Sequence, residues 1–276
     1  MIMKKYYLPY GWLFATRASK FDIFNICTIF INYALASFLF LFIYFEGTGR
    51  WILDYFIGFT GMMSLYECGY IFNDVVTTQY ENSPTQRIKN ARQKNEMLRH
   101  LENLLTIRFI YFFLASYWIY VHKFENLLIY VFLSVGLLVS YSLHNYIRSG
   151  WNGITFFILV QFKYFVPISI FLSVGELLYY YVWISIVAVF EQSILHWSEK
   201  EYFSYVPVLK ENVERFRVEY FFVVTILFMV IIYFKILDAK YIVLPAIYLV
   251  YRIIGMLSLK NKYVVNMVNK RRNMHK

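Results

Sequence analysis

The chain has 276 residues, of which 60% are hydrophobic and only 16% are charged. A soluble domain is about half apolar and about a quarter charged, so this composition excludes an ordinary soluble core. Apolar runs of about twenty residues recur along the chain, and helices of that length cross a bilayer. The net charge of +10 would suit nucleic acid, but its distribution along the chain indicates a membrane protein with no nucleic-acid partner.

The apolar runs predict an all-α, polytopic membrane bundle that forms a single membrane domain over residues 1–276. Its fourth and eighth spans are short, and tyrosines and tryptophans gather near the span ends, as in an aromatic belt. No cleavable signal peptide is expected, because residues 1–20 lack a short apolar core with a small-residue cleavage site. The eight predicted spans lie near residues 21–45, 51–72, 105–122, 126–142, 151–172, 177–195, 219–237 and 241–257.

The lysines and arginines predict the orientation, since 20 of the 27 fall on one side of the membrane. That side is the cytoplasm by the positive-inside rule. Both termini are then cytoplasmic in a multi-pass protein of the plasma membrane, and the tail from Lys260 to Lys276 binds anionic lipid heads. The cytoplasmic segments are the N-terminus, the loops 73–104 and 196–218, the turn 143–150 and the basic tail 258–276.

Three further features of the sequence give predictions about single residues or short segments. Arg252, in the last span, is expected to reach the nearby cytoplasmic surface. Cys27 and Cys68 lie in apolar segments and indicate neither a disulfide nor a metal site. Apolar residues alternate with charged ones near the end of the first long loop, which predicts either an amphipathic helix at the membrane interface or a plain surface helix. These apolar residues are Met97, Leu98, Leu101, Leu104 and Leu105.

The most informative stretch runs from Glu67 to Arg87 and reads ECGYIFNDVVTTQYENSPTQR. If the helix continues past Asp74, then Asp74, Thr77 and Glu81 share one face. Carboxylates at a helix C-terminus meet the negative end of the dipole, so burying them there requires a cation. Mg²⁺ would supply that charge, since it binds through one or two carboxylates together with substrate phosphates.

This stretch resembles the first acidic motif, Asn-Asp-x-x-Asp-x-x-x-Asp, of the UbiA superfamily of intramembrane prenyltransferases. Asn73 and Asp74 match it, Thr77 occupies the third position and Glu81 the last. The resemblance implies a UbiA-like bundle of eight to nine spans. It also implies catalytic roles for Asn73, Asp74 and Glu81, with Mg²⁺ held by Asp74 and Glu81.

Further stretches extend the resemblance to residues that bind substrate phosphate. Pro84 to Arg87 is similar to the His-Pro-x-Lys-Arg run of the branch that makes polyprenyl-phosphate phosphoribose, which implies that Arg87 contacts phosphate. Tyr141-Ser142 resembles the Tyr-Ser-x-x-x-Lys stretch of the family, with Tyr146 in the lysine position and Arg148 as the nearest cation.

Two more sites complete the predicted set. Lys163 lies near the middle of its span, where a charge is costly, so it is expected to face the bundle interior with a phosphate or Glu67 as its partner. The phosphoribose branch has a Lys-Arg-x-x-Glu pattern after the sixth span, and Glu199 or Glu201 is the matching acid here.

The resemblance implies a Mg²⁺-dependent transfer between a polyprenyl (di)phosphate and an acceptor, including polyprenyl phosphate with a phosphoribosyl diphosphate donor. The alternative is a catalytically degenerate carrier or accessory protein for polyprenyl lipids. Thr77, Tyr146 and the lack of a second Asp pair favour that alternative. A secondary transporter is a third possibility, although its usual paired, Gly/Pro-broken spans are weak here.

Overall fold

The structure is a computed structural model that describes residues 4–17, 30–47, 49–80, 87–88, 90–147, 149–198 and 213–258. Within these residues all regular structure is helical and no strand occurs. The helices are α1 (Lys4–Tyr7), α2 (Gly11–Arg17), α4 (Leu35–Tyr44), α5 (Trp51–Val75), η1 (Thr77–Gln79), α6 (Ala91–Arg99), α7 (Leu101–His122), α8 (Phe124–Tyr146), α9 (Asn152–Ile168), α10 (Val174–Ile184), η2 (Ser185–Val189), α11 (Phe190–Ser198), α12 (Val213–Tyr233), η4 (Ala239–Ile242) and α13 (Val243–Ser258).

Five helical segments in the described part of the chain are long and apolar enough to cross a membrane, so the chain is an all-α, multi-pass membrane protein. Two further apolar helices are shorter, because α9 has 17 residues and α4 has 10. Helix α5 has 25 residues, but buried acids interrupt its apolar sequence. The five segments are Leu101–His122, Phe124–Tyr146, Val174–Ser198, Val213–Tyr233 and Ala239–Ser258.

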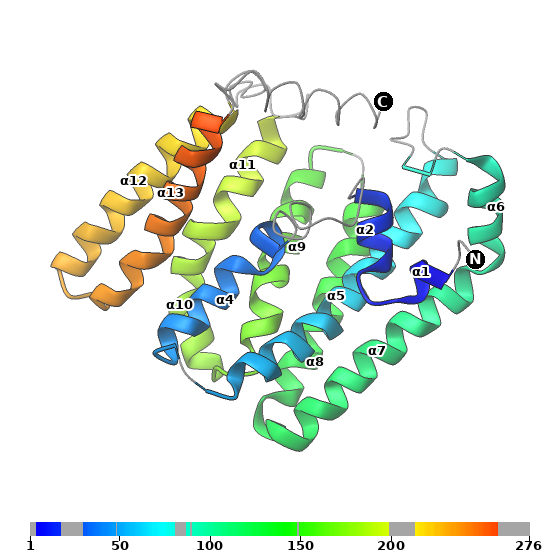
Figure 1. Ribbon diagram of the computed structural model, residues 1–276, viewed down its shortest axis with the longest axis horizontal. Helices are drawn as coiled ribbons and strands as arrows, with labels where there is room; N and C mark the ends of the chain where they lie inside the picture. Colours follow the sequence, from blue (N-terminus) through cyan, green and yellow to red (C-terminus); the bar gives the residue numbers. More distant parts are fainter. Residues whose placement is uncertain are drawn as a thin grey trace. The chain divides into compact units, whose positions relative to one another are not determined.

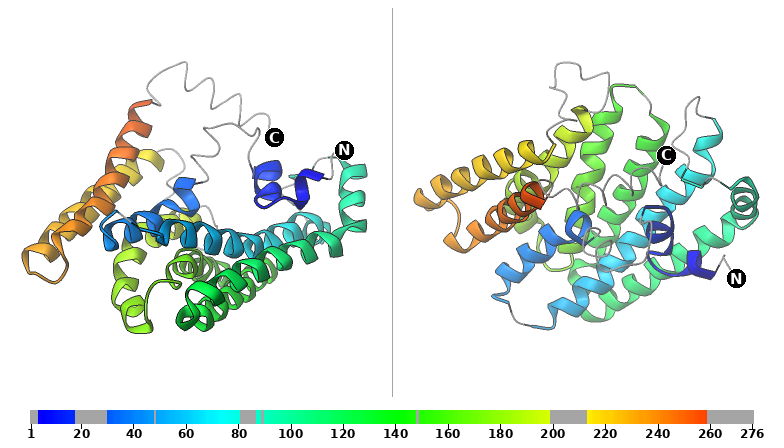
Figure 2. Two further views of the ribbon diagram at one scale, coloured as in Figure 1. Left: turned by 60° about the horizontal axis from the view of Figure 1, so that its bottom comes forward. Right: turned by 45° about the horizontal axis from the view of Figure 1, so that its top comes forward.

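The chain divides into two compact units, and the first comprises Met1–Leu35 and Gly49–Tyr179. Helices α7 and α8 form a tight hairpin with Lys123 alone between them, and α5 packs along α7 (Figure 1; Figure 2, left). Helices α8 and α9 also contact α5, and the short N-terminal helices α1 and α2 pack against α7 and α5 respectively. Helix α5 is therefore surrounded within this unit and buries residues on most of its sides.

The second unit comprises Ala36–Thr48 and Tyr180–Lys276. Helices α12 and α13 lie side by side as a hairpin (Figure 1; Figure 2). Its turn includes Lys235, whose positive φ of 57° reverses the chain direction. The rings of Phe221 and Tyr248 stack across the two helices with centroids 5.1 Å apart. Helix α11 also contacts α12, which is the first helix of this hairpin.

Several span ends differ from the expectation. The fourth predicted span, 126–142, is helical from Phe124 to Tyr146 and is a full-length helix of 23 residues. The third begins at Leu101, because the chain breaks its helical path at His100, where φ is −103° and ψ is 13°. These boundaries could not be predicted from the sequence, because polar residues occur equally well in a loop and in the first or last turn of a helix.

Candidate functional site

Asp74 lies in the last turn of α5, and its side chain is fully buried. Both oxygens of its carboxylate accept hydrogen bonds from other segments of the chain. The indole Nε1 of Trp12 donates to Oδ2 over 3.0 Å, and Nη1 of Arg87 donates to Oδ1 over 3.2 Å. We call Trp12, Asp74 and Arg87 the Asp74 site. The cation that lies beside this buried carboxylate is the guanidinium of Arg87, a residue that the resemblance had assigned to substrate phosphate.

Helix α5 ends at Val75, and a single 3-10 turn follows. Side chains of that turn satisfy the last backbone carbonyls, which have no partner within the helix. Thr77 Oγ1 donates to the carbonyl of Asn73 over 2.7 Å, and Thr78 Oγ1 donates to the carbonyl of Asp74 over 2.9 Å. The chain therefore continues for about one turn past Asp74, but in 3-10 geometry and not as an α-helix.

The hydroxyl of Thr77 also donates to Oδ1 of Asn73 over 2.9 Å. The threonine in the third position of the motif thus binds the first residue of the motif instead of facing a shared ligand. Glu81 lies outside the described residues.

A second cation reaches the same turn from helix α6. The ammonium of Lys94 donates to Oγ1 of Thr78 over 2.9 Å, and that hydroxyl is in turn bound to the carbonyl of Asp74. Sequence reasoning did not single out Lys94, because one more lysine in a cytoplasmic loop is expected from topology alone. Only the packing of α6 shows that Lys94 approaches the end of α5.

A second buried acid, Glu67, lies two helical turns before Asp74 on α5. Its Oε2 lies 2.9 Å from Nε of Arg108, and both side chains are fully buried. Its Oε1 accepts from the backbone amide of Leu13 over 2.8 Å. Arg108 also donates to the carbonyls of Tyr6 and Tyr7. Glu67, which was one of the two partners predicted for Lys163, is thus paired with Arg108 instead.

The N-terminal helices are held in place by these polar contacts. Gln93 of α6 donates to the hydroxyl of Tyr6 over 2.7 Å. The pKa of Tyr6 is raised, because the effect of burial is larger than the opposing effect of this hydrogen bond. The hydroxyl of Tyr10 bonds Thr60 over 2.7 Å, and burial is the main cause that raises its pKa to about 12. Both phenols therefore stay neutral, so the charges at this end of the unit are those of the acids, lysines and arginines.

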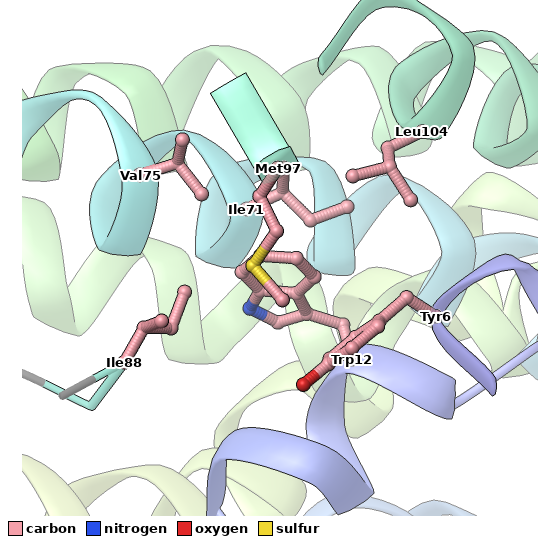
Figure 3. Packing of buried hydrophobic residues seen from close by; sticks show 7 residues of the cluster. All are labelled: Tyr6, Trp12, Ile71, Val75, Ile88, Met97 and Leu104. Carbon is pink, nitrogen blue, oxygen red and sulfur yellow. The ribbon is translucent and has the colours of Figure 1, made fainter. Parts of the chain in front are cut away.

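An apolar cluster packs around Trp12, the residue whose indole binds Asp74 (Figure 3). Met97 and Leu104 are fully buried in it. The helix that carries Met97 is amphipathic, as predicted, since Met97 is buried in the cluster while most of its charged residues are exposed. The cluster comprises Tyr6, Trp12, Ile71, Val75, Ile88, Met97 and Leu104.

Tyr141 on α8 packs against the part of α5 that precedes Asp74 in the sequence. Its ring stacks on Tyr66 at 4.8 Å and meets Tyr70 edge-on at 5.4 Å. This approach depends on Gly69, because a Cβ there would lie 1.5 Å from Cδ1 of Tyr141. Tyr66, Tyr70 and Asp74 are spaced by four residues and share one face of α5.

Lys163 on α9 is buried, with 4% of its surface exposed, as expected for a lysine that faces the protein interior. Its ammonium donates to the carbonyl of Asn32 over 3.1 Å. It also lies 4.9 Å from the ring centroid of Tyr33 and 4.6 Å from that of Tyr164. Cation–π contacts of this kind stabilise a desolvated ammonium.

The second unit contains its own buried charge cluster. Oε1 of Glu191 accepts from Nε of Arg217 over 2.6 Å and from Nη2 of Arg252 over 3.4 Å. Arg217 also pairs with Glu214. Arg252 is only 7% exposed, so the expectation that it reaches the membrane surface is wrong. A carboxylate on a neighbouring helix neutralises it inside the unit instead.

Four predicted site residues lie outside the part of the chain that the structure describes: Glu81, Arg148, Glu199 and Glu201.

The described residues include only part of the ligand set that the resemblance implies for Mg²⁺, since Glu81 lies outside them. No group of three or more histidine, cysteine, aspartate or glutamate side chains gathers among them. At Asp74 both oxygens already accept from nitrogen donors, and Oδ1 of Asn73 accepts from Thr77. A hard cation, which requires oxygen ligands, would therefore have to share these oxygens with the nitrogen and hydroxyl donors already bound to them. Compared with family models, curated proteins and solved structures, the chain matches none of them.

Proposed function

We propose that this protein is a membrane transferase that acts on a polyprenyl phosphate or diphosphate. The observation that carries the proposal is the Asp74 site. A buried acid ends a long helix of a membrane bundle, and an arginine from the following loop lies 3.2 Å from it. Arginine binds phosphate oxygens through two parallel hydrogen bonds, so Arg87 is suited to hold the phosphate head of a lipid.

The surroundings of the site support a lipid substrate. Large apolar side chains are exposed along α7, α8 and α12, and in a membrane protein such surfaces face lipid. A polyprenyl chain can then lie in the bilayer while its phosphate reaches the basic end of α5. The proposal includes the UbiA-like layout of eight to nine spans, the plasma membrane and cytoplasmic termini, because the positive-inside rule places the basic loops in the cytoplasm.

Within this proposal the residues of the chain act by binding and positioning. Arg87 and Lys94 attract the phosphate head, Trp12 and the apolar cluster exclude water, and Tyr141 and Lys163 line the deeper part of the first unit. Exclusion of water strengthens each charge interaction at the site. It also protects a reactive intermediate from hydrolysis.

The test is a transfer assay with protein purified in detergent. Radiolabelled polyprenyl phosphate is incubated with phosphoribosyl diphosphate, and polyprenyl diphosphate is incubated with aromatic acceptors, each with and without Mg²⁺. The expected result is diphosphate release together with a new labelled lipid. Mass spectrometry of lipids that copurify with the protein identifies the chain length. Absence of product with every donor, in protein that still binds the lipid, would leave only the carrier function.

A carrier or accessory protein for polyprenyl lipids is the second candidate, and one observation favours it. Each oxygen of the Asp74 carboxylate already accepts a hydrogen bond, one from Trp12 and one from Arg87, and Thr77 stands where the family motif has a third acid. A carrier requires tight binding of the lipid phosphate but no metal-assisted departure of diphosphate. Lipid binding without turnover, in the assay described above, would establish this function.

A further inference from the structure

The charge balance at the end of α5 leads to an inference about how the lipid phosphate binds, and it rests on the proposed function. A carboxylate that is fully buried at a helix C-terminus needs a positive neighbour. The structure meets this need with Arg87, from a segment 13 residues further along the chain. Trp12 donates to the other oxygen, so each oxygen of the carboxylate has a donor from the protein and its charge is offset by Arg87.

We propose that Arg87 takes the place of a divalent cation at this site, so that Arg87 and Lys94 bind the phosphate head of a polyprenyl lipid without bound metal. The ligand class is a phosphate monoester on an apolar chain. Asp74 then serves as a positioning residue, because it holds Arg87 at the end of α5 and does not itself touch the phosphate.

The exposure of the two partners supports these roles. The side chain of Asp74 is 0% exposed, whereas that of Arg87 is 34% exposed. A guanidinium carries five N–H donors, and only one of them is bound to Asp74 in the contacts described. Arg87 can therefore keep its bond to Asp74 and offer other donors to a phosphate.

The charges of the three residues leave a positive excess. Asp74 cancels Arg87, while Lys94 donates to the neutral hydroxyl of Thr78. Both cations reach the same turn, since Thr78 is bonded to the carbonyl of Asp74. A phosphate monoester, which carries about −1.5 to −2 charges near pH 7, would be attracted by this positive excess.

The first experiment compares binding with and without metal. Tritiated farnesyl phosphate, a short polyprenyl phosphate, is bound to the purified full-length protein in detergent with either Mg²⁺ or EDTA. The expected result is a Kd that differs less than twofold between the two conditions. A Kd at least tenfold higher in EDTA would overturn the inference and leave the proposed function standing. Absence of binding in both conditions would overturn the proposed function as well.

Two competitors separate the possible sources of the phosphate. Unlabelled farnesyl phosphate is expected to displace the probe, whereas inorganic phosphate and farnesol compete at least tenfold less well. Competition by inorganic phosphate as strong as that by farnesyl phosphate would show a site for free anions and would contradict the lipid assignment.

Variants of the acid and its arginine give the sharper distinction. Asp74→Asn keeps one acceptor oxygen but loosens the hold on Arg87, so binding is expected to weaken by the same small factor, about threefold, in EDTA and in Mg²⁺. If Asp74 held a metal ion, the same change would weaken binding at least tenfold. Arg87→Gln is expected to weaken binding at least tenfold and also to leave Asp74 without its cation.

A double variant keeps the test valid if Arg87→Gln fails to fold. Asp74→Asn with Arg87→Gln removes both charges together, so the thermal unfolding temperature is expected to recover while binding stays weak. Recovery of binding in that double variant would contradict a direct role for Arg87. Lys94→Gln is expected to weaken binding about threefold to tenfold, and the matched control Arg92→Gln, an exposed residue on the same helix, leaves it unchanged.

Discussion

Glu67 and Asp74 lie seven residues apart on α5, and both of their buried carboxylates are bound by the N-terminal helices. Glu67 accepts from the backbone amide of Leu13, and Asp74 accepts from the indole of Trp12. Seven residues are two turns, so the two acids share one face of the helix. The N-terminal segment is therefore part of the folded unit around the Asp74 site.

Arg108→Gln is expected to destabilise the protein by about 3–5 kcal/mol, because removing one partner of a buried ion pair leaves the other charge uncompensated. The measurement is equilibrium unfolding in mixed detergent micelles. Arg99→Gln, an exposed position just before the same helix, serves as the control and should change stability little. Adding Glu67→Gln to Arg108→Gln should restore part of the loss, and a further loss of stability in that double variant would contradict the pairing.

Gly69→Ala is expected to destabilise the packing of α5 against α8 by roughly 1–3 kcal/mol or more, as overpacking of a core does. The new Cβ would lie 1.5 Å from Cδ1 of Tyr141. Thermal unfolding in detergent measures the effect. Gly175→Ala is the matched control, since no heavy atom lies within 4 Å of a Cβ at that position. Equal behaviour of the two variants would show that Tyr141 does not pack on Gly69.

Glu191→Gln is expected to destabilise the second unit by about 3–5 kcal/mol, because it leaves the buried Arg252 and the partly buried Arg217 without their shared carboxylate. The exposed pair of Arg215 and Glu219 provides the comparison. Glu219→Gln should cost about 0–1 kcal/mol, the usual value for a surface pair. Both are measured by equilibrium unfolding, and similar losses for the two would contradict the buried network.

The orientation is tested with single cysteines in a variant that lacks Cys27 and Cys68. Tyr80→Cys and Phe234→Cys are suitable because both side chains are exposed, at 83% and 65%. By the positive-inside rule, a membrane-impermeant maleimide should label position 234 in right-side-out vesicles and position 80 only in inverted ones. Labelling of position 80 from the outside would place the Asp74 site on the opposite face of the membrane.

The sequence by itself determined that this is a helical membrane protein and that a buried carboxylate at Asp74 would need a positive neighbour. Apolar runs of sufficient length predict membrane helices whatever their neighbours, because the backbone must satisfy its own hydrogen bonds in lipid. The need for a cation at Asp74 also followed from the residue and its helix end alone. Likewise, the costly charge of Lys163 predicted a buried position in the protein interior, where the structure places it.

Only the tertiary structure decided which cation meets which acid. The sequence predicted no partner for Arg108, Arg252 or Lys94, because periodicity carries no information about partners from other helices. The pairs Arg108 with Glu67, Arg252 with Glu191 and Arg87 with Asp74 join residues 13 to 61 positions apart. Buried charges stabilise a fold only beside such partners, and the packing of the helices brings those partners together.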